Sequence, residues 1–164
     1  MDTVTVFQDL SDYGYIPDNA RPGTKNVGWL GAGEEFERAT PTDALLRALW
    51  EYCKVSVAQT RGIHDCELCS EPSSYNAERE GERLLLGAAE IRVFSDGPSI
   101  FAAPTLIYHY VSVHHYRAPD QFIEALLVAP GPPARVYFEK LEALGLKWNA
   151  TSPGAGPRFK FGGR

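Results

Sequence analysis

The chain is poor in cysteine and methionine and has no long apolar segment. It contains three cysteines and one methionine among 164 residues. A small, odd number of cysteines argues against a disulfide framework. No stretch approaches the roughly 18 apolar residues of a membrane-spanning helix, and the opening MDTVTVFQDL lacks the apolar core of a signal peptide. We therefore expect a cytoplasmic protein with no membrane association.

Basic residues are in the minority. Lys and Arg total 16 against 21 Asp and Glu, which gives a formal net charge of -5. Broad nucleic-acid surfaces depend on Lys and Arg side chains that neutralise phosphates, so we do not expect a nucleic-acid partner. The same negative charge favours solubility and suits a basic protein partner.

Several catalytic signatures are also missing. The sequence has no His-Glu-x-x-His motif and no phosphate-binding loop with Lys and Ser or Thr. It lacks the His-x-Glu and Pro-Cys-x-x-Cys pair of zinc deaminases. The glycine-rich GWLGAG at 28–33 has no strand–turn–helix context, so we interpret it as a turn. These absences argue against the corresponding enzyme classes.

A metal-binding pattern is present. Cys66 and Cys69 have two residues between them, and such a pair can supply half of a tetrahedral zinc site from one tight turn. A predicted hairpin and a predicted helix follow, and this helix carries His109 and His114. A knuckle, a hairpin and a ligand-bearing helix in this order are typical of a treble clef. The pattern predicts a Zn²⁺ site formed by Cys66, Cys69, His109 and His114.

Two alternatives concern the ligands. On an ideal helix His109 and His114 are separated by about 140°, so both reach one ion only if the helix tightens or ends near Val113. His64 is the alternative ligand in place of either histidine, and His115 is the least favoured.

A redox role of the cysteine pair is disfavoured because the pair follows a turn-rich segment rather than a strand. Cys53 lies on an apolar helical stripe, which indicates a buried core thiol.

Hydrophobic periodicity predicts an α+β fold with a small mixed or antiparallel sheet, three to four helices and a treble-clef-like zinc substructure. We expect residues 1–128 to form the zinc-containing domain. Residues 129–149 form a hinge and a C-terminal helix on the same domain, and 150–164 form a disordered basic and aromatic tail. The expected strands are 3–7, 26–31, 84–94 with a break near Gly87, and 100–104. The expected helices are 40–55 with Thr42 as cap, 105–116, 118–128 and 135–148.

Several stretches together point to a family. They are TVTVFQDLSDYGYIPDN, VGWL, QTRGIHDCELC, LGAAEIRV and FAAPTLIYHYVSVHHYRAPDQFIEAL, which run over most of residues 3–126. In them the chain resembles an uncharacterised family of small bacterial single-domain proteins with a His-x-Cys-x-x-Cys knuckle and a His-containing helix. The resemblance implies one compact unit that links knuckle and helix, and it implies no activity.

Three functions fit these observations, and the third of them is a regulator that reaches nucleic acid with its basic tail. Four protein ligands, two of them thiolates, favour a closed structural zinc site. The first hypothesis is therefore a non-enzymatic, zinc-stabilised cytosolic binding protein of the inhibitor, immunity or adaptor type, with a basic protein as partner. The alternative is a zinc-dependent, nuclease-like hydrolase in which Glu67 or Glu90 acts as the base. The acids and tyrosines of QDLSDYGYIPDN are interpreted as turn caps rather than as a binding patch.

Overall fold

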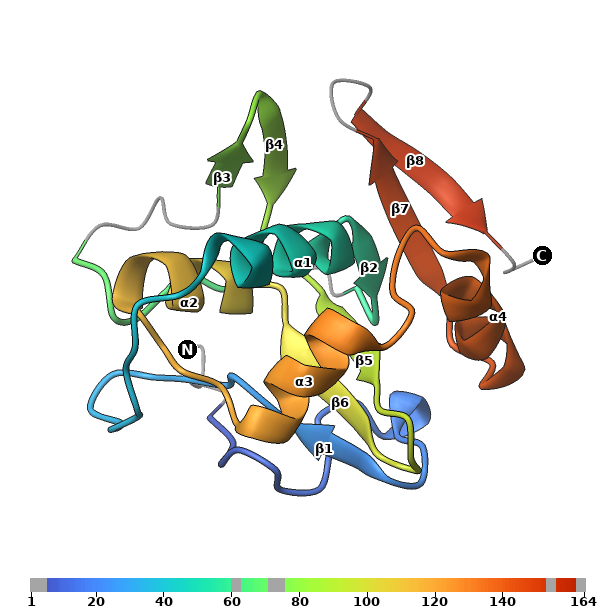
Figure 1. Ribbon diagram of the computed structural model, residues 1–164, viewed down its shortest axis with the longest axis horizontal. Coiled ribbons are helices and arrows are strands. Elements are labelled where there is room, and N and C mark those ends of the chain that lie inside the picture. The colour runs from blue at the N-terminus through green and yellow to red at the C-terminus, as the bar shows by residue number, and fades with distance from the viewer. Residues whose placement is uncertain (1–5, 60–62, 71–75, 153–155, 162–164) are drawn as a thin grey trace.

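The computed structural model describes residues 6–59, 63–70, 76–152 and 156–161 (Figure 1). Within them the chain folds into four α-helices, one short 3-10 helix at Pro17–Asn19 and two sheets. The larger sheet is mixed and has six strands in the order β1-β6-β5-β2-β7-β8, and the smaller sheet pairs β3 with β4. The predicted α+β fold with a small mixed sheet is confirmed.

The centre of the larger sheet is the antiparallel hairpin of β5 and β6, in which every residue is buried. β1 extends the sheet in parallel with β6, while β2 joins β5 to β7 by antiparallel pairs. The strands of this sheet are β1 Thr24–Asn26, β2 Val55–Val57, β5 Glu90–Phe94, β6 Ile100–Pro104, β7 Trp148–Ser152 and β8 Gly156–Phe161. The smaller sheet consists of β3 Asn76–Arg79 and β4 Glu82–Leu85.

Helices cover the hairpin (Figure 1). They are α1 Asp43–Cys53, α2 Ile107–His114, α3 Asp120–Val128 and α4 Arg135–Ala143. α1 begins as predicted, because the Thr42 hydroxyl accepts a hydrogen bond from the Leu45 N–H at 3.1 Å. α1 and α3 pack on β5, and Phe122 of α3 meets Phe101 of β6 with ring centroids 5.7 Å apart. The buried side chains between these helices and the hairpin form the main core.

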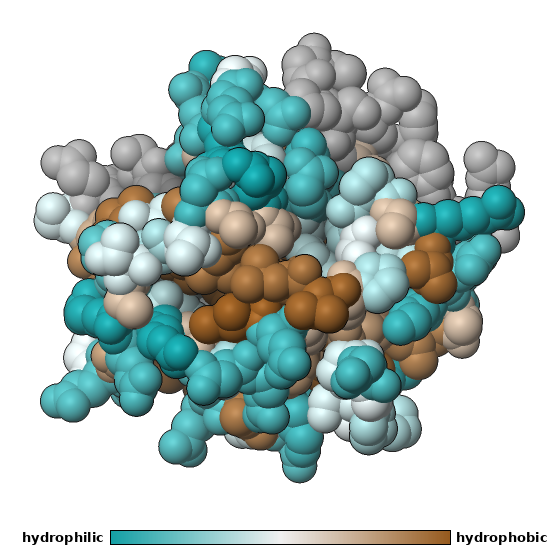
Figure 2. Space-filling view, viewed as in Figure 1, coloured by the Kyte–Doolittle hydropathy of each residue, from teal (hydrophilic) through white to brown (hydrophobic). Residues whose placement is uncertain are grey.

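The outer surface of the helices is partly apolar. Figure 2 shows apolar side chains gathered over the region of α1 and α3. Leu127 and Val128 at the end of α3 are exposed. No helix in the described ranges has the length and apolarity required to cross a membrane.

The strand predictions had mixed outcomes. The predicted hairpin is confirmed for residues 90–104, and so is the break near Gly87, which has a φ of +96° and separates β5 from β4 of the smaller sheet. The strand predicted at 26–31 is wrong in position, because β1 covers Thr24–Asn26 and Gly28 leaves extended geometry at a φ of +78°. Of the strand predicted at 3–7, residues 3–5 lie outside the described residues, and 6–7 are not in a strand.

The C-terminal segment also differs from the prediction. The sequence predicts disorder from residue 150, whereas β7 and β8 pair as an antiparallel ribbon at the edge of the larger sheet. The preceding helix α4 is anchored on the sheet, because fully buried Tyr137 donates a hydrogen bond from its hydroxyl to the Arg92 carbonyl at 2.6 Å. β7 also pairs with the distant strand β2, and such a partner is not revealed by composition alone.

Candidate metal centre

Two cysteines of one loop and two histidines of one helix meet beside α2. Cys66 and Cys69 come from the loop before β3, which we call the knuckle (residues 64–70), and His109 and His114 come from α2. One ligand atom from each residue lies within 4.8 Å of all the others. The structure thus brings together the four residues that the sequence singles out, and this cluster could bind a metal ion.

The distances between sulfur and nitrogen atoms fit a tetrahedral ion. The Cys69 Sγ lies 3.2 Å from His109 Nε2 and 3.3 Å from His114 Nε2. The Cys66 Sγ lies 3.4 Å from His114 Nε2. With Zn–S bonds of about 2.3 Å and Zn–N bonds of about 2.0 Å, a tetrahedral site places sulfur and nitrogen about 3.5 Å apart. The cluster is therefore close to the size that zinc requires.

The end of α2 explains how both histidines reach one point. His109 lies in the first turn of α2, and His114 is its last residue. At His115 the backbone turns into the left-handed conformation with a φ of +58°, and the His115 N–H donates to the Tyr110 carbonyl. Arg38 donates a hydrogen bond to the His114 carbonyl at 2.8 Å. The helix thus ends one residue beyond Val113, and the two imidazole centroids lie 5.1 Å apart.

The knuckle is fixed to the start of β5 by a close backbone approach. The His64 N–H donates to the Gly87 carbonyl at 2.9 Å, and the Gly87 N–H donates to the Thr105 hydroxyl at 2.9 Å. A Cβ atom at Gly87 would lie 2.4 Å from the His64 carbonyl oxygen, so only glycine allows this approach. His64 itself is exposed and is not in the cluster, and His115 is likewise exposed.

Burial sets the protonation of the ligands. It raises the pKa of the Cys66 thiol to about 11, although the Leu68 N–H donates to this sulfur at 3.3 Å. Burial, followed by the charge of His114, lowers the pKa of His109 to about 4. Burial and then Arg38 lower the pKa of His114. The imidazoles are therefore neutral, as metal binding requires, while a buried thiolate needs a nearby cation.

The two carboxylates proposed as catalytic bases lie outside the cluster. Glu67 is exposed, and its Oε1 accepts a hydrogen bond from the Ala32 N–H at 3.2 Å. Glu90 is only 2% exposed and accepts a hydrogen bond from Arg92 Nη1 at 2.7 Å. The Tyr13 hydroxyl lies 3.0 Å from both carboxylate oxygens of Glu90.

The sequence interpretation missed this buried group of Tyr13, Glu90 and Arg92. The alternation in EIRVF places Glu90 and Arg92 on one face of β5, and that was the signal available.

The predicted core position of Cys53 is confirmed, and burial raises the pKa of its thiol to about 12. Asp12 pairs with Lys25 at 2.6 Å at the surface.

Comparison with known proteins places the chain in a family. The model of the family described as a domain of unknown function, DUF7919, matches residues 5–127, and the chain belongs to this family. The matched region includes all four residues of the cluster. No curated protein and no solved structure matches the chain. The family brings no function, which is therefore inferred from the site.

Proposed function

We propose that this family member is a non-enzymatic binding protein whose fold is stabilised by one Zn²⁺ ion held by Cys66, Cys69, His109 and His114. The observation that carries the proposal is the convergence of two thiol sulfurs and two imidazole nitrogens at tetrahedral spacing. Thiolate and imidazole ligands in this number are typical of structural zinc.

A structural role also follows from what the ion would join. The knuckle has little regular structure of its own, and α2 has only eight residues. An ion between them would tie the segment before β3 to the helix after β6, a link between residues 40 to 48 positions apart in the sequence. The order of knuckle, hairpin and ligand-bearing helix supports a treble-clef-like substructure. Four protein ligands leave no position for a water molecule at a tetrahedral ion, which favours binding over hydrolysis.

The proposed partner is a basic protein in the bacterial cytoplasm, in an adaptor or inhibitor relationship. The net charge of -5 supports a basic partner, and the family resemblance supports the bacterial setting. The hydrolase alternative has less support, because the Glu90 carboxylate is buried against Arg92 and the Glu67 carboxylate engages a backbone N–H.

Elemental analysis of the purified protein tests this proposal. We expect one zinc per chain after exhaustive dialysis, and zinc loss in Cys69→Ala and in His109→Ala. Cys53→Ala and His64→Ala are the matched controls, and both should retain the metal. Absence of zinc from the wild-type protein would contradict the proposal. Zinc retained in the folded His109→Ala variant would imply an exchangeable position and would favour the hydrolase.

A further inference from the structure

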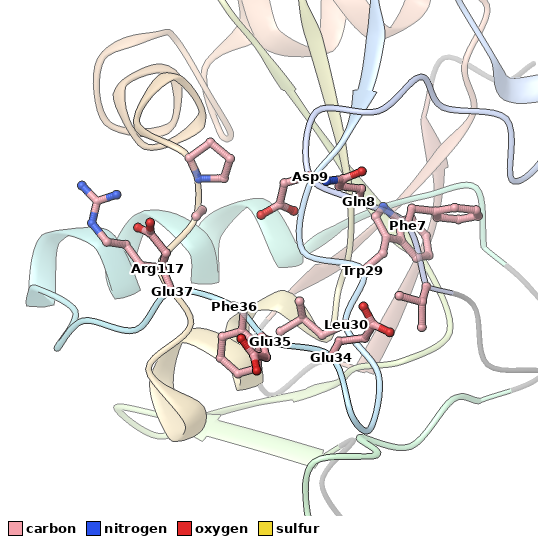
Figure 3. Close-up of a pocket in the computed structure, with 13 residues that line it drawn as sticks. Phe7, Gln8, Asp9, Trp29, Leu30, Glu34, Glu35, Phe36, Glu37 and Arg117 are labelled. Carbon is pink, nitrogen blue, oxygen red and sulfur yellow. The ribbon is translucent and has the colours of Figure 1, made fainter.

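An open groove lies between the N-terminal segment, the loop before α1 and the loop after α2, and none of its lining residues belongs to the metal cluster (Figure 3). Its volume is about 780 Å³, which is large enough for several side chains of a partner. One wall contains Phe7, Asp9 and Trp29, and the other contains Phe36, Glu37 and Arg117. Glu34 and Glu35 lie along the floor, close to Leu30 (Figure 3).

The groove carries negative charge that the protein does not neutralise. Asp9 is half-buried, and its two oxygens accept hydrogen bonds from the Gly28 N–H at 2.9 Å and from the Tyr116 hydroxyl at 2.7 Å. Neither donor carries a charge, and within the described ranges Asp9 forms no ion pair. Glu34 and Glu35 are exposed and likewise form no ion pair with any described residue.

The positive group lining the groove does not balance these carboxylates. Arg117 is paired with Asp120, with 2.5 Å between Nη2 and Oδ1. Since Asp120 neutralises this guanidinium, the groove keeps the charge of Asp9, Glu34 and Glu35. These carboxylates would attract a cationic ligand.

The aromatic walls favour a planar cation. Trp29 is held rigidly, because its Nε1 donates to the Ala102 carbonyl at 3.0 Å and its ring meets Phe7 at 5.4 Å between centroids. The protein's own Arg38 lies over the Phe36 ring at 4.3 Å from the centroid. Arg38 thus already occupies the Phe36 ring and Trp29 is only 6% exposed, so a ligand guanidinium would stack on half-buried Phe7.

We propose that this groove binds a basic segment of a protein partner through an arginine side chain, which stacks on the aromatic wall and pairs with Asp9 and the Glu34–Glu35 carboxylates. Arginine fits better than lysine because its planar group combines stacking with paired hydrogen bonds to carboxylates. This inference rests on the proposed binding function and names the site and the chemistry of the partner.

The test uses the full-length zinc-loaded protein and two synthetic peptides, acetyl-Gly-Gly-Arg-Gly-Arg-Gly-amide and the same peptide with Gln in place of both Arg residues. Binding is followed by ¹⁵N chemical-shift perturbation, with the Trp29 indole N–H as the reporter. We expect the arginine peptide to bind and the glutamine peptide not to bind. The dissociation constant should rise about tenfold in Glu34→Gln/Glu35→Gln and also in Asp9→Asn.

The matched control is Glu139→Gln/Glu142→Gln, which removes the same charge from exposed positions on α4. This control should bind the peptide as the wild-type protein does. Equal affinities of the groove variant and the control, or no shift of the Trp29 signal at millimolar arginine peptide, would overturn the groove assignment. Zinc content is measured on the same samples. A protein that contains zinc but does not bind the arginine peptide would overturn the groove assignment alone, whereas a protein without zinc would contradict the proposed function.

Discussion

Two buried polar clusters in this protein differ in how they are balanced. The group of Tyr13, Glu90 and Arg92 contains an anion, a cation and a hydroxyl, and its carboxylate has partners at 2.7 and 3.0 Å. The metal cluster contains two thiols and two imidazoles and no cation of its own. The first cluster balances its charges with protein side chains, although the buried Arg92 Nη2 has no hydrogen-bond partner among the described residues, whereas the second gathers four ligand atoms that an ion would complete.

The difference indicates what each cluster contributes. A buried ion pair contributes little net stability compared with an apolar replacement, but breaking it is costly. A metal site contributes its binding free energy to folding when the ion is present. The protein is therefore expected to respond to metal removal at one cluster and to loss of a charge partner at the other.

The largest effect is expected from loss of a metal ligand. Cys69→Ala removes the sulfur that lies within 3.3 Å of both histidine nitrogens. We expect zinc loss and a decrease in the free energy of unfolding of more than about 5 kcal/mol, measured by urea denaturation. A chelator should destabilise the wild-type protein and leave Cys69→Ala unchanged. Equal chelator effects on both proteins would contradict a role of Cys69 as ligand.

A smaller effect is expected at the ion pair. Arg92→Met leaves the Glu90 carboxylate buried with only the Tyr13 hydroxyl, so the protein should lose about 3–5 kcal/mol of stability while zinc content stays unchanged. The double variant Glu90→Gln/Arg92→Met removes the unpaired charge and should recover part of this loss. Zinc loss in Arg92→Met at a temperature where the variant is folded would show that the two clusters are coupled.

The smallest effect is expected from Tyr13→Phe. This change removes the hydroxyl that donates to Glu90 but keeps the ring under the Arg92 guanidinium, 4.7 Å from the centroid. A hydrogen bond to a charged group is worth about 1.5–3 kcal/mol, and thermal denaturation at constant zinc should report this loss. Tyr15→Phe, which keeps the ring contacts with Phe7 and Trp29, is the control. An equal loss of stability in Tyr13→Phe and Tyr15→Phe would mean that the loss does not come from the hydrogen bond between Tyr13 and Glu90.

Local sequence signals predicted the parts of the fold that depend on neighbouring residues. Thr42 and the apolar stripe of α1 are local, as are the two cysteines of the knuckle. The convergence of His109 and His114 was predictable only on the condition that α2 ends early, which the left-handed His115 fulfils.

Other features depend on distant partners. β1 is a three-residue strand of Thr, Lys and Asn that exists because β6 lies beside it. β7 pairs with the distant strand β2, and this pairing joins the β7–β8 ribbon to the larger sheet although the composition of the segment is typical of a tail. Alternation places Glu90 and Arg92 on one face, but only the folded structure places Tyr13 against them. Pairings of this kind are selected by tertiary contacts rather than by intrinsic propensity.

The central claim is that Cys66, Cys69, His109 and His114 form a closed zinc site. The most direct test is X-ray absorption at the zinc K-edge of the purified protein. We predict a first shell of two sulfurs at about 2.3 Å and two nitrogens at about 2.0 Å in the wild-type protein, and no bound zinc in Cys69→Ala. A first shell with oxygen from water, or with fewer than two sulfurs in the wild-type protein, would contradict it.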